Sequence, residues 1–280
     1  MESCKKSWVE VMFKNKTYNL ANIDGLYIQN ISTTHPVGEN DQIEIKGVDG
    51  VIPAPSTYKP FELEIELMYR GIDAKDVELL VFRLNNFLSV RDPYYIRHSN
   101  MPGLKYAVLP NPKIEDEYKT LRDRTIKITF TCYKGYSESY EATNKMNFIN
   151  DDWQFQEGLK AADKLKYVHY DWGYEIYNGS SDYINPFNQS LTIKLNLDAP
   201  KGFTLHNKTT GDKFEYYEPL KRNETFELRD VYPIKNYSEH VGHLTNFEWI
   251  TLAPGYNDIE IYGRDLGYTK SEWIFNFTFK

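Results

Sequence analysis

Cysteine, long apolar runs and net positive charge are scarce or missing in this sequence, which rules out several classes of protein. Its two cysteines, Cys4 and Cys132, cannot form a disulfide framework or a four-ligand zinc site, so we expect free thiols in a reducing cytoplasm. No window approaches about 18 consecutive apolar residues, which argues against a membrane span. No apolar run of signal-peptide length follows the first lysines, which argues against ordinary secretion.

The charge balance argues against a protein that wraps nucleic acid. The chain has 33 basic and 40 acidic residues and a formal net charge of −7, and an acidic chain does not gain affinity by releasing counterions from phosphates. Hydrophobic residues make up 41% and aromatic residues 15% of the chain, which is too much apolar surface for a disordered protein. A length of 280 residues is typical of about two domains.

Strand patterns dominate the sequence. In FELEIELMY, residues 61–69, apolar residues alternate with glutamates. This period of two predicts a strand with one buried face. The same alternation predicts strands over residues 125–133, 190–198, 257–263 and 273–280, and a shorter one over 42–47.

One amphipathic helix is predicted over residues 73–90. Asp73 can act as its N-cap, and Asp92-Pro93 ends it because the residue before a proline disfavours the helical conformation. The apolar residues that follow helical spacing are Val77, Leu80, Val81, Leu84, Phe87 and Leu88. A second helix is predicted over residues 157–166, although Gly158 weakens its start.

These elements predict a mainly β protein with two domains. We expect an α+β N-terminal domain over residues 1–140, with the helix on a β-barrel or sheet, and a linker with a short helix over 141–166. The remainder, 167–280, has short strands and turns at intervals typical of a β-sandwich or jelly roll. Its last strand, 273–280, is a candidate for packing back on the N-terminal domain.

No motif predicts catalysis, so we expect no enzyme, no catalytic residue and no cofactor. The nucleophile elbow, phosphate loop, dinucleotide-binding glycines, zinc-protease motif and CxxC are all missing. His240 and His243 are two residues of a metal site at most, because no third ligand is evident. The acidic clusters at 115–117 and 151–152 are best interpreted as solvated faces.

Four aromatic residues in the C-terminal half could serve either of two roles. Rings of a sandwich are most often buried in its core, but exposed rings also stack on the apolar faces of sugars. The residues are Tyr216, Tyr217, Tyr232 and Trp249. They are candidates for contact with a glycan or a partner protein.

The order of the segments resembles that of siphophage distal tail proteins. The run 25–70, GLYIQNISTTHPVGENDQIEIKGVDGVIPAPSTYKPFELEIELMYR, is followed by the helix, by DPYYIRHSNMPGLKYAVLP (92–110) and by the strand at 125–133. In the second half, FEWITLAPGYNDIEIYG (247–263) is similar to a strand–Pro-Gly–strand signature of the family's galectin-like sandwich. The resemblance therefore covers both halves of the chain.

This resemblance implies a virion structural protein of the tail tip, or baseplate hub, made in the cytoplasm of the host bacterium. Family members form a homo-hexameric ring, single or stacked, around a channel through which DNA passes without specific binding. The implied partners are the tail tube protein, a tail-associated lysin or tip protein, and a receptor-binding protein for host adsorption. No membrane partner is implied.

Residues 33–60 are predicted to be a loop that contacts neighbouring copies in the ring. Prolines restrict the backbone and so reduce the entropy that is lost on assembly. The candidate contact residues are Pro36, Asp49, Pro53, Pro55 and Pro60.

Two other functions compete with this interpretation. The first alternative is a monomeric, lectin-like protein whose C-terminal sandwich binds carbohydrate. The second is a glycoside hydrolase whose carboxylate pair the sequence does not reveal, because sequence adjacency says nothing about the distance across a cleft.

Overall fold

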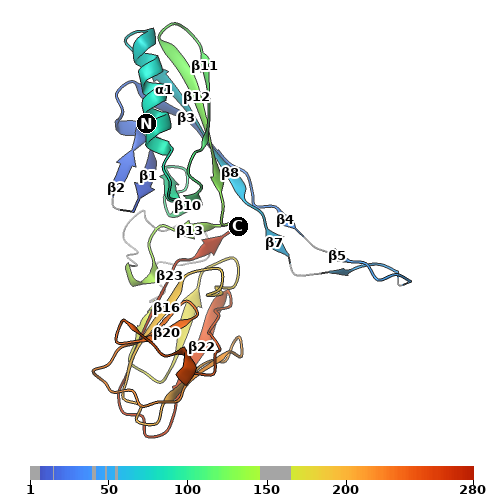
Figure 1. The fold of residues 1–280 in the computed structure, drawn as a ribbon, viewed down its shortest axis with the longest axis vertical. Helices are drawn as coiled ribbons and strands as arrows, with labels where there is room; N and C mark the ends of the chain where they lie inside the picture. The colour runs from blue at the N-terminus through green and yellow to red at the C-terminus, as the bar shows by residue number, and fades with distance from the viewer. Residues whose placement is uncertain (1–6, 15, 40–41, 48, 54–55, 146–164) are drawn as a thin grey trace, which may run out of the picture. The chain divides into compact units, whose positions relative to one another are not determined.

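The computed structural model describes residues 7–280, apart from 15, 40–41, 48, 54–55 and 146–164. The chain divides into two compact units, Met1–Glu138 with Lys280, and Ser139–Phe279. Both units consist mainly of strands (Figure 1), which confirms the mainly β fold class. Within the described segments, the structure contains no helix whose length and apolar character would let it cross a membrane.

A single large sheet forms the framework of the first unit. Across the sheet the strands are β2 (Lys16–Asn19), β1 (Val9–Phe13), β9 (Tyr94–His98), β10 (Leu104–Val108), β12 (Asp123–Cys132), β8 (Phe61–Arg70) and β3 (Leu26–Thr33), and β11 (Lys113–Tyr118) also pairs with β12. β8 and β12 pair antiparallel along their whole length, with Arg70 opposite Asp123 and Phe61 opposite Cys132. The strands predicted over 61–69 and 125–133 are therefore confirmed.

Alternation along β8 places its apolar side chains in the core. Leu63, Ile65 and Leu67 are fully buried, and the glutamates between them point to the other face of the sheet. Burial of each such side chain contributes about 1.5–3 kcal/mol. The pairing of β8 with β12 therefore sets the position of the hydrophobic core in the first unit.

The helix α1 (Ala74–Leu88) packs its apolar face against this sheet. The side chain of Asp73 accepts a hydrogen bond from the Asp76 backbone amide, as an N-cap should. Val77, Leu84 and Leu88 are buried at helical spacing. The helix predicted over 73–90 is confirmed, although it begins one residue later, at Ala74, and ends two residues earlier, at Leu88.

Residues 34–60 are here called the arm, and the described ones among them form a narrow ribbon between β3 and β8 (Figure 1). Within the arm, β4 (Gly38–Glu39) pairs with β7 (Thr57–Tyr58), and β5 (Gln42–Ile43) pairs with β6 (Ile52–Pro53). The arm is therefore a hydrogen-bonded hairpin rather than the expected loop. The strand predicted over 42–47 is shorter in the structure and ends at Ile43. Further along, Gly47 and Gly50 adopt φ angles of 90° and 86°, a conformation that favours glycine.

Two sheets share the core of the second unit. One has the order β14 (Val168–His169), β23 (Thr269–Phe275), β16 (Leu191–Leu197), β19 (Phe226–Arg229), β20 (Tyr232–Lys235) and β21 (Glu239–His240). The other has the order β15 (Gly173–Asn178), β22 (Gly255–Tyr262), β17 (Phe203–Asn207) and β18 (Lys213–Tyr216). Buried residues of both, such as Trp273 and Ile259, form one cluster, so this unit is a β-sandwich. The strands predicted over 190–198 and 257–263 are confirmed.

Short elements complete the described structure. They are the 3-10 helices η1 (Leu20–Asn22), η2 (Thr143–Lys145) and η4 (Gly242–Leu244), and the strands β13 (Ser137–Ser139) and β24 (Thr278–Phe279). The helix predicted over 157–166 lies mostly outside the described residues, and Leu165 and Lys166 are not helical. The linker over 141–166 and the packing of 273–280 on the N-terminal domain stay predictions.

Truncation of Leu84 should destabilise the first unit far more than truncation of its neighbour Phe82. Leu84 is 2% exposed whereas Phe82 is 63% exposed on the same helix. We expect Leu84→Ala to lower the free energy of unfolding by about 2–5 kcal/mol through lost burial and a residual cavity. Phe82→Ala should change it by roughly 0.5 kcal/mol or less. Denaturant unfolding measures both, and equal losses would contradict the packing of α1 on the sheet.

Candidate assembly surfaces

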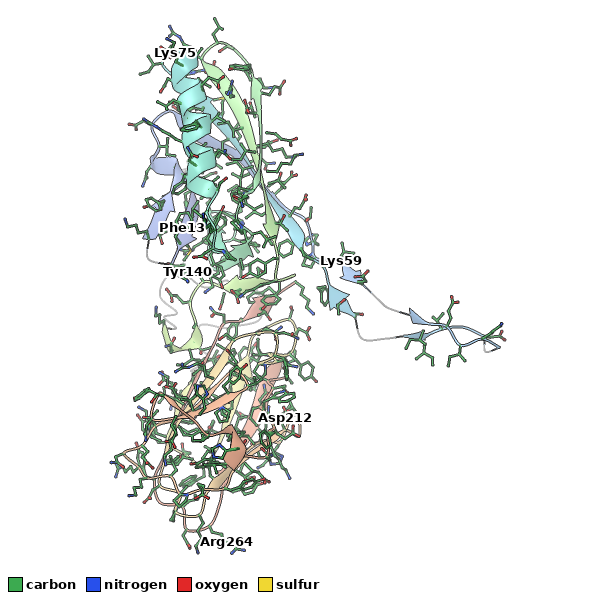
Figure 2. All side chains as sticks on the ribbon, in the orientation of Figure 1. Phe13, Lys59, Lys75, Tyr140, Asp212 and Arg264 are labelled. Carbon is green, nitrogen blue, oxygen red and sulfur yellow. The ribbon has the colours of Figure 1, made fainter. Side chains whose placement is uncertain are left out.

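Hydrogen bonds and an ion pair hold the base of the arm. The Thr34 amide donates to the Glu62 carbonyl at 2.9 Å, and the Lys59 amide donates to the Val37 carbonyl at 3.0 Å. The Lys59 ammonium lies 2.8 Å from a carboxylate oxygen of Glu39, and Figure 2 shows Lys59 where the arm leaves the sheet. The arm therefore starts in a defined direction from β3 and β8.

The predicted ring-contact residues are spread along this arm. Pro36 is half-buried before β4, and Pro60 is exposed immediately before β8. Asp49 is exposed in the turn between β5 and β6. Pro53 belongs to β6, and Pro55 lies outside the described residues.

The arm also presents apolar side chains that sequence reasoning missed. Six of them rank among the exposed large hydrophobic residues of the described chain. They are Val37, Ile43, Ile45, Val51, Ile52 and Tyr58. A two-stranded ribbon is marginally stable in water by itself, and a row of exposed apolar residues indicates an interaction surface.

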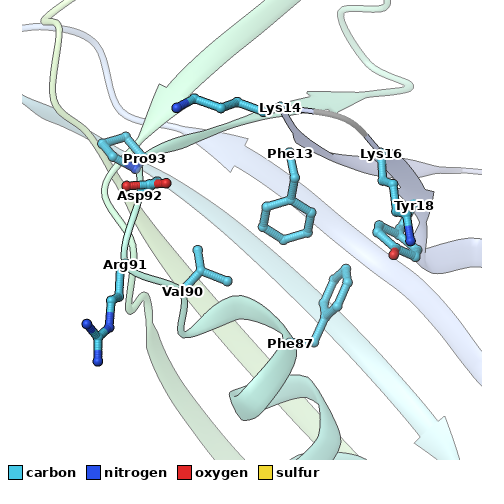
Figure 3. Close-up of a pocket in the computed structure, with 9 residues that line it drawn as sticks. All are labelled: Phe13, Lys14, Lys16, Tyr18, Phe87, Val90, Arg91, Asp92 and Pro93. Atoms are coloured by element: carbon cyan, nitrogen blue, oxygen red, sulfur yellow. The ribbon is translucent and has the colours of Figure 1, made fainter.

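A second surface lies where the end of α1 meets the β1–β2 hairpin. Figure 3 shows a pocket with Phe13 and Phe87 facing each other and Tyr18 beside them. The ring centroids of Phe13 and Phe87 are 5.4 Å apart, and those of Tyr18 and Phe87 are 5.1 Å apart, both pairs edge to face. Such contacts add to the burial energy of the rings and give the pocket a firm apolar floor.

This pocket continues along α1 as a groove. A neighbouring pocket is lined by Leu20, Leu80 and Leu84 and shares Tyr18 and Phe87 with the first. We call the combined surface the α1 groove. Its basic lining residues are Lys14, Lys16, Arg83 and Arg91, and its acidic lining residue is Asp92.

The four aromatic candidates of the second unit do not share one surface. Tyr216 is 2% exposed and packs on Phe226 with ring centroids 4.8 Å apart, so it belongs to the core and offers no face to a ligand. Tyr217 and Tyr232 are exposed. Trp249 is half-buried. Among the described residues, no ring contact joins the three that reach the surface.

Phe247 is an exposed ring that sequence reasoning missed. It is 72% exposed and its φ angle is 60°, a left-handed conformation that is strained for a bulky residue. The side chain of Asn246 holds this loop on β18, since it donates to the Lys213 carbonyl at 2.8 Å and accepts from the Glu215 amide at 3.1 Å. The loop thus presents Phe247 to solvent in a fixed position.

Side chains that could support chemistry are dispersed in the described structure. His240 and His243 are exposed, and no group of three potential metal ligands occurs among the described residues. Burial raises the pKa of the Cys132 thiol to about 12, which makes it a poor nucleophile. In the acidic cluster at 115–117, Asp116 pairs with the buried guanidinium of Arg124 at 2.9 Å. The cluster at 151–152 lies outside the described residues.

His98 is buried in the first unit without a charge partner. It is 2% exposed, and neither ring nitrogen has a hydrogen-bond partner among the described residues. Its ring stacks on Tyr106 with centroids 5.2 Å apart. Desolvation lowers the pKa of His98 to about 4, so the folded unit holds it as neutral imidazole.

Comparison with known proteins connects this fold to phage tails. Residues 13–132 match the family described as the phage tail protein RIFT-related domain. The crystal structure of SPP1 Dit (gp 19.1), described as a paradigm of the hub adsorption apparatus in phages that infect Gram-positive bacteria, superposes with a TM-score of 0.68 at 14% identity, over 97% of this chain and 99% of that chain. A chain of the phage p2 baseplate in its activated conformation gives 0.46 at 12% identity, over 96% and 97%. No curated protein matches significantly.

A stretch of the first unit, residues 13–132, is therefore similar to a phage tail protein domain, and the chain as a whole has the fold of SPP1 Dit. Both findings agree with the family that the sequence resembles, and they are the ground for the function proposed below.

His98 should make the first unit sensitive to acid. The unfolded pKa is 6.5 and the folded pKa is about 4, so the unfolded state binds the proton first. Stability is therefore lost as the pH falls through this window, by roughly 3 kcal/mol in total. His98→Phe keeps a ring against Tyr106 and should lose much less stability over the same window. Denaturant unfolding near pH 6.5 and near pH 4 tests this, and equal losses in both proteins would refute it.

Proposed function

We propose that this protein assembles into a hexameric ring in the tip of a siphophage tail. The ring joins the tail tube to the tip and host-adsorption proteins and leaves a central channel for DNA. The observation that carries this proposal is the arm, a hairpin that exposes apolar side chains along its length. Such a surface is costly in a monomer and is expected to be covered in an assembly.

The shape of the arm supports a ring. In the proposed ring the arm of each copy contacts a different surface on its neighbour, which makes the interface heterologous. Heterologous interfaces close into rings when the rotation between neighbours divides a full turn. Backbone hydrogen bonds at Thr34 and Lys59 order the base of the arm, so less conformational entropy is lost there when the arm docks.

The remaining parts of the proposal concern what the ring contacts. We propose that the tail tube protein binds one side of the ring and that a tail-associated lysin or tip protein binds the other side. We propose that a receptor-binding protein binds the second unit. DNA passes through the channel without specific binding, which the formal charge of −7 per chain favours because acidic walls repel phosphates.

Removing apolar side chains from the arm should abolish the ring. In the triple variant Ile43→Ser, Ile45→Ser, Ile52→Ser, each change removes an apolar group that the ring would bury at about 1.5–3 kcal/mol. We expect the concentration needed for assembly to rise roughly 100-fold or more. Light scattering and negative-stain electron microscopy measure this as loss of ring-shaped particles.

A matched control removes exposed apolar side chains outside the arm. The variant Ile72→Ser, Phe82→Ser, Leu121→Ser changes three residues that are also strongly exposed and should still form rings. A wild-type protein that stays monomeric at all concentrations would contradict the proposed function and favour the lectin-like alternative.

The exposed rings of the second unit support a second candidate role, contact with a host polysaccharide. Phe187 packs edge to face on Trp249 with centroids 4.7 Å apart, and both Phe187 and Phe247 expose their rings. Their loops are fixed by the bridge between Ile184 and Leu252 and by Asn246. Rigid exposed rings suit the apolar faces of sugars, which stack without adaptation of the protein.

This role is tested with polysaccharide purified from the walls of Gram-positive bacteria. Phe187→Ala and Phe247→Ala should each weaken binding roughly tenfold, the cost of one lost stacking contact of about 1.4 kcal/mol. Tyr170→Ala, at another exposed ring of the same unit, should bind like the wild type. Calorimetry measures the affinities, and an equal loss in all three variants would count against a site at these loops.

A further inference from the structure

From the surfaces of the first unit we infer that the arm of one copy lies in the α1 groove of the next copy. This inference rests on the proposed ring and names the two surfaces that would close it. It goes beyond the ring itself, because it selects one partner surface for the arm among all those that a neighbouring copy presents.

The two surfaces are complementary in polarity. The groove floor consists of Phe13, Tyr18 and Phe87, continued by leucines that include Leu80 and Leu84. The arm offers branched apolar side chains along its two strands. Aliphatic side chains packed on aromatic rings give a dry, closely packed interface centre, which is where binding energy concentrates.

The two surfaces are also complementary in charge. The sequence of the arm carries four acidic residues against Lys46 and Lys59. Glu39 is paired with Lys59, and Asp41 lies outside the described residues, which leaves Glu44 and Asp49 against Lys46 near the turn. The groove is lined by Lys14, Lys16, Arg83 and Arg91 against the single acid Asp92. Opposite charges around an apolar centre steer association and fix the register of the partners.

The geometry of the first unit allows the arm to reach a neighbour. From Gly38 to the turn at Gly47 the arm has ten residues, which span about 33 Å in extended conformation. The arm leaves the sheet between β3 and β8, whereas the groove is formed by the β1–β2 hairpin and the C-terminal end of α1. Since arm and groove are different surfaces, their contact is heterologous and repeats from copy to copy.

Cross-linking between two chains tests the contact directly. One full-length chain carries Glu44→Cys on the arm, and a second chain, distinguishable by mass, carries Lys16→Cys on the groove rim; Cys4→Ser is added to both. Cys132 is buried and is not expected to react. A short bismaleimide should join the two chains, and Leu121→Cys in place of Lys16→Cys should give at least tenfold less product, because an exposed site outside the contact reacts only by random encounter.

The particles are imaged in the same samples, which separates the inference from the proposed function. Rings with the cross-link support both. Rings without the cross-link overturn the arm–groove contact and leave the ring intact. The cross-link without rings supports the contact and contradicts the closed ring, and monomers without the cross-link contradict both.

Charge reversal gives an independent readout. Lys14→Glu with Arg91→Glu should raise the concentration needed for assembly at least tenfold, because the groove then repels the acidic arm. Glu44→Lys with Asp49→Lys should do the same from the arm side. All four changes together should restore assembly, and a combined variant that assembles no better than either double variant would overturn the inference.

Discussion

Pairing of β8 with β12 is the constraint on which the first unit depends. The two strands pair without interruption from Arg70–Asp123 to Phe61–Cys132. In this register the apolar side chains of β8 and those of β12 lie on the same face of the sheet. That face receives α1 through Val77 and Leu84. Because β8 begins where the arm ends, the same pairing that builds the core also fixes where the arm leaves the sheet.

The sequence was sufficient for the elements that carry a strong local period. β8, β12, β16, β22 and α1 all have one buried and one exposed face, and a regular apolar repeat reports that directly. Prediction from the sequence was less successful for strands that have no buried face. Ile43 and Ile45 alternate with polar residues as a strand would, yet they lie exposed on the arm, and alternation alone cannot say whether a core exists to receive them.

The candidate surfaces were harder to predict because they join residues that are distant in the sequence. Phe13 and Phe87 meet in the α1 groove only after the sheet and helix have formed. The helical spacing selects Phe87 for the apolar face of the helix, but it does not indicate that Phe13 contacts it. Tyr216 and Tyr217 are neighbours in the sequence, but Tyr216 is buried in the core and Tyr217 is exposed to solvent. Successive side chains of an extended chain point to opposite sides, which explains the difference. Phe247 depends on the backbone conformation that Asn246 imposes, which composition does not reveal.

The exposed arm also needs protection from the wrong partner. Two hairpins with unpaired edges and exposed isoleucines tend to associate with each other, which would produce aggregates rather than a ring. Glu44 and Asp49 near the turn of the arm disfavour that contact, because like charges placed opposite one another repel. The same residues favour a basic surface such as the α1 groove. In the proposed ring, the charge of the arm therefore has two effects: it makes arm-to-arm contact costly, and it favours a head-to-tail contact that buries the apolar side chains.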